Sequence, residues 1–208
     1  MVVATAEYES GKARALEWNR RTSAQVRDIG PPPPPKNPAQ RGDAFGDLGA
    51  FLRLYFAQSF PLEFSPDHLD VISTLERVAT SGGLYALAMP RGSGKTTITI
   101  RAALWAILTG RRKFVTIVSA TDNAAKKCIR ALKMELTHNA ALYADFPKEI
   151  HGIPQLQGDN RRAGGQLCEG ERTSVVLGQS EIVFPTIPGS SVSGCVITSR
   201  SEERRVGK

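Results

Sequence analysis

One short run of residues constrains the fold of this chain more than any other: Arg91-Gly92-Ser93-Gly94-Lys95-Thr96-Thr97. A polyphosphate concentrates several negative charges in a small volume, so a site for it needs many N–H donors at close range. Gly92 and Gly94 have no Cβ atom, which allows the backbone to curl around a phosphate. A helix that begins near Lys95 adds the positive end of its dipole. The run therefore predicts a phosphate-binding loop.

The side chains of this loop suit a triphosphate with its metal ion. Lys95 is expected to bridge the β- and γ-phosphates as a mobile point charge, and the Thr96 hydroxyl is expected to ligate Mg²⁺. Thr97 is placed to donate to the α-phosphate. The residues expected to contact the nucleotide are Pro90, Arg91, Gly92, Ser93, Gly94, Lys95, Thr96 and Thr97.

The segments around the loop follow the strand, loop and helix order that such a loop requires. The apolar run 84–89 predicts a short buried strand, and residues 96–108 form an apolar helical segment. The β-branched run 113–119 predicts a second buried strand, and Thr121 or Asp122 is expected to cap a helix that ends near His138. This alternation implies a parallel sheet with right-handed crossovers.

Weaker patterns predict further elements on both sides. Ser65 is a suitable cap, and Pro66 a suitable first residue, for a helix that ends before residue 81. Residues 173–177 and 180–184 are expected to form a pair of strands around a Gly178-Gln179 turn. Val196 is expected to open one more strand.

Composition divides the chain into three parts. Residues 1–44 hold few large apolar side chains and include five consecutive prolines at 31–35, so we expect a disordered arm and linker. Residues 45–199 are expected to form the folded domain. Residues 200–208 are charge-dense and resemble read-through at the edge of a truncated gene. We therefore expect a disordered or non-native tail and a domain that is incomplete at its C-terminus.

Charge and cysteine content narrow the functional classes. The formal net charge is +7, which favours a polyanionic partner. The three cysteines, Cys128, Cys168 and Cys195, form no CxxC pair, so free thiols in a reducing cytoplasm are expected. No apolar run approaches the ~20 residues that cross a bilayer, and the N-terminus lacks the pattern of a signal peptide, so no membrane association is expected.

Residues 89–96, Met-Pro-Arg-Gly-Ser-Gly-Lys-Thr, resemble the variant Walker A loop of terminase large subunits, the ATPases that pump viral DNA into bacteriophage heads. Residues 118–122, Val-Ser-Ala-Thr-Asp, resemble the segment of terminases and helicases that turns from the second sheet strand into a helix. Residues 64–68 resemble the adenine-side motif, with His68 where that motif usually has Gln.

This resemblance implies a three-layer P-loop NTPase fold of the RecA/ASCE-like kind, with a parallel sheet flanked by helices. It implies ATP and Mg²⁺ as cofactors and double-stranded DNA as the partner. It also implies a homo-oligomeric ring that works with a small terminase subunit and a portal in the cytoplasm of a bacterial host. The counterpart of Arg91 reaches the γ-phosphate or a neighbouring subunit, although a solvated loop arginine is an equal alternative. Lys95 and Arg91 are therefore the candidate catalytic residues.

Two other functions remain open. Terminases carry an apolar strand that ends in two acidic residues, and then a nuclease domain, but neither pattern follows the loop here. A helicase-like ATPase of superfamily 2 shares the two-strand pattern and the basic charge. A non-catalytic nucleotide- or DNA-binding fragment is the third possibility. No guanine-reading Asn-Lys-x-Asp is present, so ATP is expected ahead of GTP.

Two sets of polar residues are interpreted as structural. Lys126, Lys127, Arg130 and Lys133 share one predicted helix and could contact DNA phosphates, but a solvated face is the preferred interpretation. His68, His138 and His151 show no metal-ligand spacing, so structural or surface roles are expected.

Overall fold

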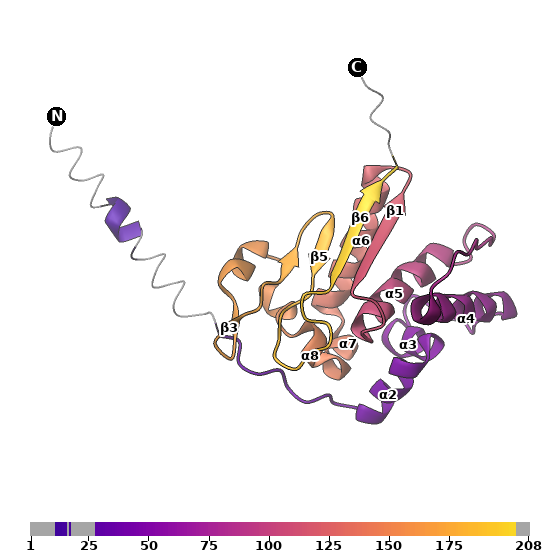
Figure 1. The fold of residues 1–208 in the computed structure, drawn as a ribbon, viewed down its shortest axis with the longest axis horizontal. Coiled ribbons are helices and arrows are strands. Elements are labelled where there is room, and N and C mark those ends of the chain that lie inside the picture. The colour runs from indigo at the N-terminus through magenta and orange to yellow at the C-terminus, as the bar shows by residue number, and fades with distance from the viewer. Residues whose placement is uncertain (1–10, 16, 18–27, 203–208) are drawn as a thin grey trace, which may run out of the picture.

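A computed structural model describes residues 11–15, 17 and 28–202 of the chain (Figure 1). Residues 11–15 and 17 are helical, and the α-helices from residue 38 on are α2 (Pro38–Gly46), α3 (Leu48–Tyr55), α4 (Pro66–Ser81), α5 (Lys95–Leu108), α6 (Asp122–His138), α7 (Ala140–Asp145) and α8 (Pro147–Ile150). Two 3₁₀ turns follow, η1 (Pro154–Leu156) and η2 (Asn160–Gly165). The strands are β1 (Phe114–Ser119), β2 (Leu167–Cys168), β3 (Glu171–Arg172), β4 (Val176–Leu177), β5 (Glu181–Val183) and β6 (Val196–Ser201).

The helices predicted from caps are confirmed. The Ser65 hydroxyl accepts from the His68 N–H at the start of α4, and Pro66 takes the first helical position. The Thr121 hydroxyl accepts from the Ala124 N–H at the start of α6. Helix α5 begins at Lys95, immediately after the two glycines of the loop. These boundaries depend on short-range hydrogen bonds, which is why local sequence predicts them well.

The predicted mixture of helices and strands is confirmed, and the main sheet is small and mixed. Its strand order is β1-β6-β5-β4, and a separate pair joins β2 to β3. Strand β1 pairs with β6 in parallel, with Phe114 beside Val196. Strands β4 and β5 form the predicted antiparallel pair, and β5 is also antiparallel to β6. The hairpin therefore introduces antiparallel pairing next to the parallel pair.

One face of the sheet is covered and the other is open in the described part of the chain. Helix α6 packs behind β1 and β6 (Figure 1). On the opposite face, the side chains of Phe114 and Val118 are 61% and 54% exposed. Strand β1 therefore forms as predicted, but the expectation that it is fully buried is wrong. Residues 28–202 do not form a second helical layer over this face.

The strand expected immediately before the loop is not formed. Residues 82–90 form neither a helix nor a strand, and Leu84 is fully exposed. Tyr85 packs under Arg77, whose guanidinium carbon lies 5.1 Å from the ring centroid. A strand needs a neighbour to bond its N–H and C=O groups, and no described segment supplies one here. The apolar run alone could not reveal that.

Packing begins before the predicted domain boundary at residue 45. Ala44 of α2 is fully buried, and the Asn37 N–H donates to Asp145 Oδ1 over 3.0 Å. Part of the expected arm is thus tied to α7, while residues 1–10, 16 and 18–27 lie outside the described residues. The predicted start of the tail, at residue 200, is also too early, because Arg200 and Ser201 belong to β6 and pair with β1. Residues 203–208 lie outside the described part.

The core forms where α3, α5, α6 and the hairpin strands meet. Its largest fully buried side chains include Trp105 of α5, Phe51 of α3, Phe146 and Phe184. The indole N–H of Trp105 donates to the Ala44 carbonyl over 2.9 Å, which joins α5 to α2. Among the described residues, no helix combines the length and the apolar character needed to span a membrane.

Candidate phosphate-binding site

The loop before α5 encloses an open cavity of about 420 Å³, lined by residues 90–97. Gly92 and Gly94 have φ angles of +83° and +78°, in the left-handed region that residues with a Cβ atom rarely adopt. Gly94 caps α5, and Lys95 is the first helical residue. The first N–H groups of a helix have no intrahelical acceptor, so those of α5 can serve an anion at the cavity.

The predicted loop residues are brought together around this cavity. Lys95 folds back along the loop, with its Nζ donating to the Met89 carbonyl over 3.4 Å. The Ser93 hydroxyl donates to the Pro90 carbonyl over 2.9 Å, which closes the loop on itself. Arg91 and Thr96 are exposed, whereas Thr97 is half-buried. The ammonium group of Lys95 is therefore held near the loop by one long hydrogen bond that a phosphate oxygen could replace.

His68 contacts the loop, and sequence reasoning missed this role. Its ring lies between the α4 cap and the loop: Nε2 is 2.8 Å from the Ser93 carbonyl oxygen, and Nδ1 is 2.6 Å from the Ser65 hydroxyl. The Ser65 N–H also donates to Nδ1 over 3.2 Å. Two sequence signals involved His68: the resemblance of residues 64–68 to the adenine-side motif, and its position three residues after the cap. That position predicts a capping interaction, not a contact with residues 25 positions further along the chain.

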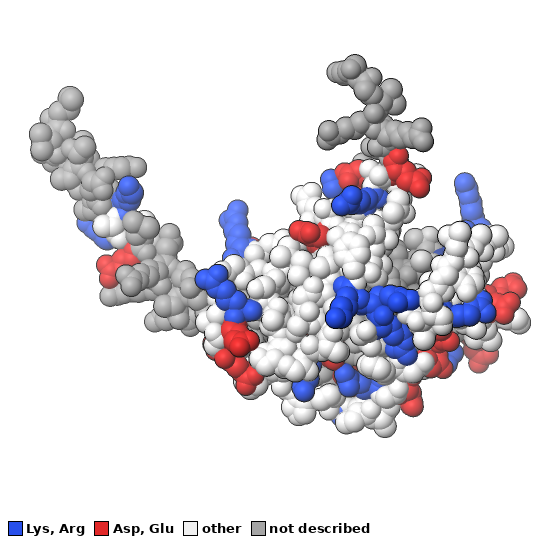
Figure 2. Space-filling view, viewed as in Figure 1, with Lys and Arg blue, Asp and Glu red and all other residues white. Residues whose placement is uncertain are grey.

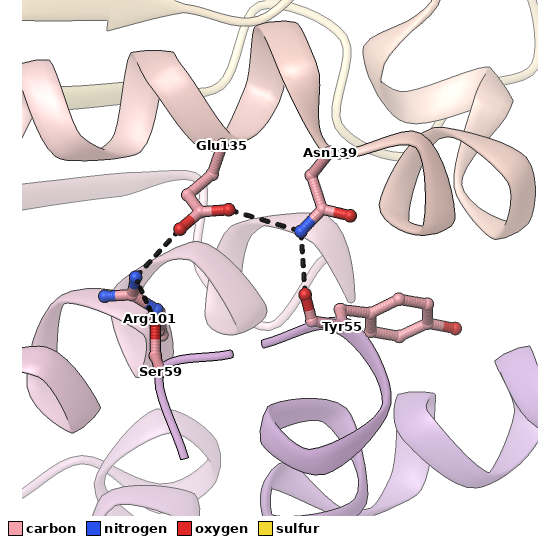
Figure 3. Close-up of polar contacts among 5 residues, drawn as sticks. All are labelled: Tyr55, Ser59, Arg101, Glu135 and Asn139. Carbon is pink, nitrogen blue, oxygen red and sulfur yellow. Dashed lines mark hydrogen bonds and ion pairs between the residues drawn. The ribbon is translucent and has the colours of Figure 1, made fainter. Parts of the chain in front are cut away.

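Helix α5 is anchored to α6 by a polar network (Figure 3). The Arg101 guanidinium donates to Glu135 over 2.8 Å and to the Ser59 hydroxyl over 3.1 Å. Asn139 donates to the second Glu135 oxygen over 3.2 Å and to the Tyr55 carbonyl over 2.7 Å. The Arg101 side chain is only 11% exposed. The network thus fixes the helix whose first turn forms one wall of the cavity.

Replacing Glu135 by Ala is expected to lower the free energy of unfolding by about 2 kcal/mol, because the nearly buried Arg101 guanidinium loses its charged acceptor. Urea unfolding followed by far-ultraviolet circular dichroism measures this change. Lys126→Ala is the matched control, because its ion pair with Asp122 is largely exposed and is expected to change stability by less than about 0.5 kcal/mol. Equal effects of the two substitutions would contradict the anchoring role.

The basic residues of α6 do not all lie unpaired on one solvent-exposed face of the helix. Lys126 pairs with Asp122 over 2.6 Å. Lys133 donates to the carbonyl oxygens of Leu177 and Gly178, over 2.9 and 3.1 Å, and so holds the turn between β4 and β5. Burial, followed by the neighbouring charge of Arg130, lowers the pKa of Lys133 below its usual range. This lysine therefore has a structural role, whereas Lys127 and Arg130 are exposed.

The other histidines and the cysteines show no second site. His151 is buried between the Tyr143 hydroxyl and the Gly30 carbonyl, and His138 is exposed at the end of α6. The three cysteines are free thiols. Within residues 28–202, no cluster of three His, Cys, Asp or Glu side chains could hold a metal ion.

Comparisons with protein-family models, with curated proteins and with solved structures find no significant match to this chain.

Proposed function

We propose that this chain is the ATP-binding part of a viral DNA-packaging motor of the terminase large-subunit kind, which couples ATP hydrolysis to the movement of double-stranded DNA into a prohead. The observation that carries the proposal is the loop at 90–97. Two glycines in left-handed conformations precede a helix whose first residue is Lys95, around a cavity that opens to solvent. This arrangement suits the phosphates of a nucleotide.

The proposal includes a role for each residue of the loop. Lys95 binds the β- and γ-phosphates, and Thr97 donates to the α-phosphate. Thr96 is exposed in the first turn of α5, so its hydroxyl is accessible to Mg²⁺. When bound, the metal ion neutralises charge on the phosphates. Arg91 is exposed at the rim and contributes its charge to the γ-phosphate or to a neighbouring subunit.

The proposal also includes a three-layer P-loop NTPase fold, with a parallel sheet flanked by helices. The parallel pairing of β1 with β6 and the helical cover of α6 on one face support it. The exposed apolar side chains of Leu84, Phe114 and Val118 support it as well, because a further layer or strand would remove them from water.

Double-stranded DNA is the proposed polymer partner. The formal charge of +7 favours a polyanion. Figure 2 shows basic side chains gathered around the junction of α5 and β1, where the sequence reads Arg111-Arg112-Lys113. Arg111 packs its guanidinium 4.1 Å from the Trp105 ring centroid, so part of this basic region is structural. Lys113, which is exposed, remains accessible to phosphate.

Titration of the purified chain with ATP, inorganic tripolyphosphate and AMP in the presence of Mg²⁺ tests the proposal. We expect ATP to bind with a Kd on the order of micromolar and tripolyphosphate to compete with it, because the loop contacts phosphates. AMP, with one phosphate, is expected to bind at least about tenfold more weakly. Isothermal titration calorimetry measures the three affinities. Equal affinity for AMP and ATP, or no binding of either, would contradict the phosphate-binding loop.

The rate of ATP hydrolysis distinguishes the proposed motor from a module that binds nucleotide without catalysis. Hydrolysis of ATP requires a carboxylate that orients the attacking water, and residues 90–97 that line the cavity include none. The chain is therefore expected to bind ATP more readily than it hydrolyses it. If the chain hydrolyses ATP steadily and linear double-stranded DNA raises the rate, the result favours the motor. Unwinding of a short duplex would favour a helicase-like ATPase instead.

A further inference from the structure

The side chain of His68, which belongs to α4, forms a hydrogen bond with the Ser93 carbonyl of the phosphate-binding loop. Its ring reaches the loop from α4, while the cavity is lined by the loop residues themselves. Phe64 packs beside the ring with a centroid separation of 6.1 Å, and Phe60 packs on Phe64. The imidazole is half-buried, and this pair of aromatic rings lies beside it.

The hydrogen bonds of His68 define which ring nitrogen carries the proton. A backbone N–H can only donate, so Nδ1 must accept from the Ser65 N–H and is unprotonated. A carbonyl oxygen can only accept, so Nε2 must donate to the Ser93 carbonyl. The ring is thus the neutral Nε2–H tautomer, and each nitrogen has a separate role: Nδ1 caps α4, and Nε2 holds the loop.

We propose that His68 is a positioning residue that holds the Ser93–Gly94 peptide with its N–H turned toward the phosphate cavity. The carbonyl of Ser93 and the N–H of Gly94 belong to one trans peptide unit, so they point in opposite directions. The hydrogen bond from Nε2 holds the carbonyl on the α4 side. The Gly94 N–H is then directed to the other side, where it can donate to a phosphate.

Without this bond the peptide can turn over easily. Gly94 has no Cβ atom, and apart from its two chain neighbours no residue lies closer than 4.0 Å to the position that a Cβ would occupy. A reversed peptide would place the Ser93 carbonyl oxygen in the cavity and would repel a phosphate. His68 therefore restricts the backbone conformation of a loop that contains two glycines. This role rests on the proposed binding of a polyphosphate.

Two conservative variants separate the two roles of the ring. In His68→Gln, the amide N–H₂ group can reach the place of Nε2 and donate to the Ser93 carbonyl. In His68→Asn, the shorter side chain can replace Nδ1 as the acceptor for Ser65 but cannot reach Ser93. We expect the Gln variant to bind ATP within about threefold of the unchanged chain, and the Asn and Ala variants to bind about tenfold more weakly. A residue that only caps α4 would leave the Gln and Asn variants with equal affinity for ATP, because each side chain has an oxygen that can accept from the Ser65 N–H.

Amide hydrogen exchange of residues 91–97 tests the same inference without nucleotide. The Asn and Ala variants are expected to exchange these amides faster than the unchanged chain, whereas the Gln variant is expected to match it. The Asn variant should retain the protection of the first turn of α4, because its cap is preserved. In the unchanged chain, nitrogen NMR of the imidazole is expected to show a protonated Nε2 and an unprotonated Nδ1.

The two proposals fail in different ways. If the unchanged chain binds neither ATP nor tripolyphosphate, the proposed function is wrong, and the exchange rates still test the role of His68 in the loop. If the unchanged chain binds ATP and the Asn variant binds it equally well, the positioning role is wrong. A protonated Nδ1, or equal exchange of residues 91–97 in all four proteins, would also overturn that role.

Discussion

Replacing Lys95 by Ala is expected to weaken the binding of Mg²⁺-ATP by about a hundredfold. Charge-assisted hydrogen bonds are worth about 1.5–3 kcal/mol, and no other ammonium group lies in the part of the loop that lines the cavity. The fold should be unaffected, because the hydrogen bond from Lys95 Nζ to the Met89 carbonyl is long, at 3.4 Å. Titration calorimetry measures the affinity, and circular dichroism checks the fold.

The matched control for this prediction is Lys127→Ala. Lys127 is an exposed lysine of α6, so the substitution removes the same charge from a different surface. We expect the affinity of this variant for ATP to stay within about twofold of the original, because surface charges at a distance are screened by salt. An unchanged affinity after Lys95→Ala, or an equal loss in both variants, would show that the loop is not the nucleotide site.

Replacing Trp105 by Ala is expected to lower the free energy of unfolding by about 3–5 kcal/mol. The side chain is 1% exposed, its indole N–H donates to the Ala44 carbonyl, and Arg111 stacks on its ring. The substitution leaves a large cavity and an arginine without its aromatic partner. Domains of this size are stable by about 5–15 kcal/mol, so the loss is a large part of the total. Urea unfolding measures the change.

Leu84→Ala is the matched control for the core substitution. Leu84 is apolar but fully exposed, so its truncation is expected to change the free energy of unfolding by less than about 0.5 kcal/mol. Trp105→Phe is expected to fall between the two, because it keeps an aromatic ring but leaves the Ala44 carbonyl without its donor. A loss below about 1 kcal/mol for Trp105→Ala would contradict the packing of α5 in the core.

The elements that sequence predicts well are those with local causes. The start of α4 depends on Ser65 and Pro66, and the start of α6 depends on Thr121, all within one turn of the helices they begin. The loop conformation depends on Gly92 and Gly94, which are the residues that tolerate positive φ. The hairpin of β4 and β5 also has its cause nearby, in the Gly178-Gln179 turn.

Segment 84–89 shows why strands are harder to predict than capped helices. Its apolar residues are as suitable for a strand as those of β1, and β1 does form. The difference is that β1 lies beside β6, about 80 residues away in sequence, which pairs with one edge of β1 along its whole length. Pairing at such a separation depends on the path of the intervening chain. A hydrophobic pattern carries no information about that path.

The sequence by itself determined the conformation of the loop at 90–97, because two glycines act through the backbone beside them. It also determined the helices that follow their own caps. Only the tertiary structure decided that His68 reaches Ser93, that Lys133 holds the β4–β5 turn, and that segment 84–89 has no partner. Those outcomes depend on which distant segments meet, and the free energy of such contacts is determined by the packing of the whole chain.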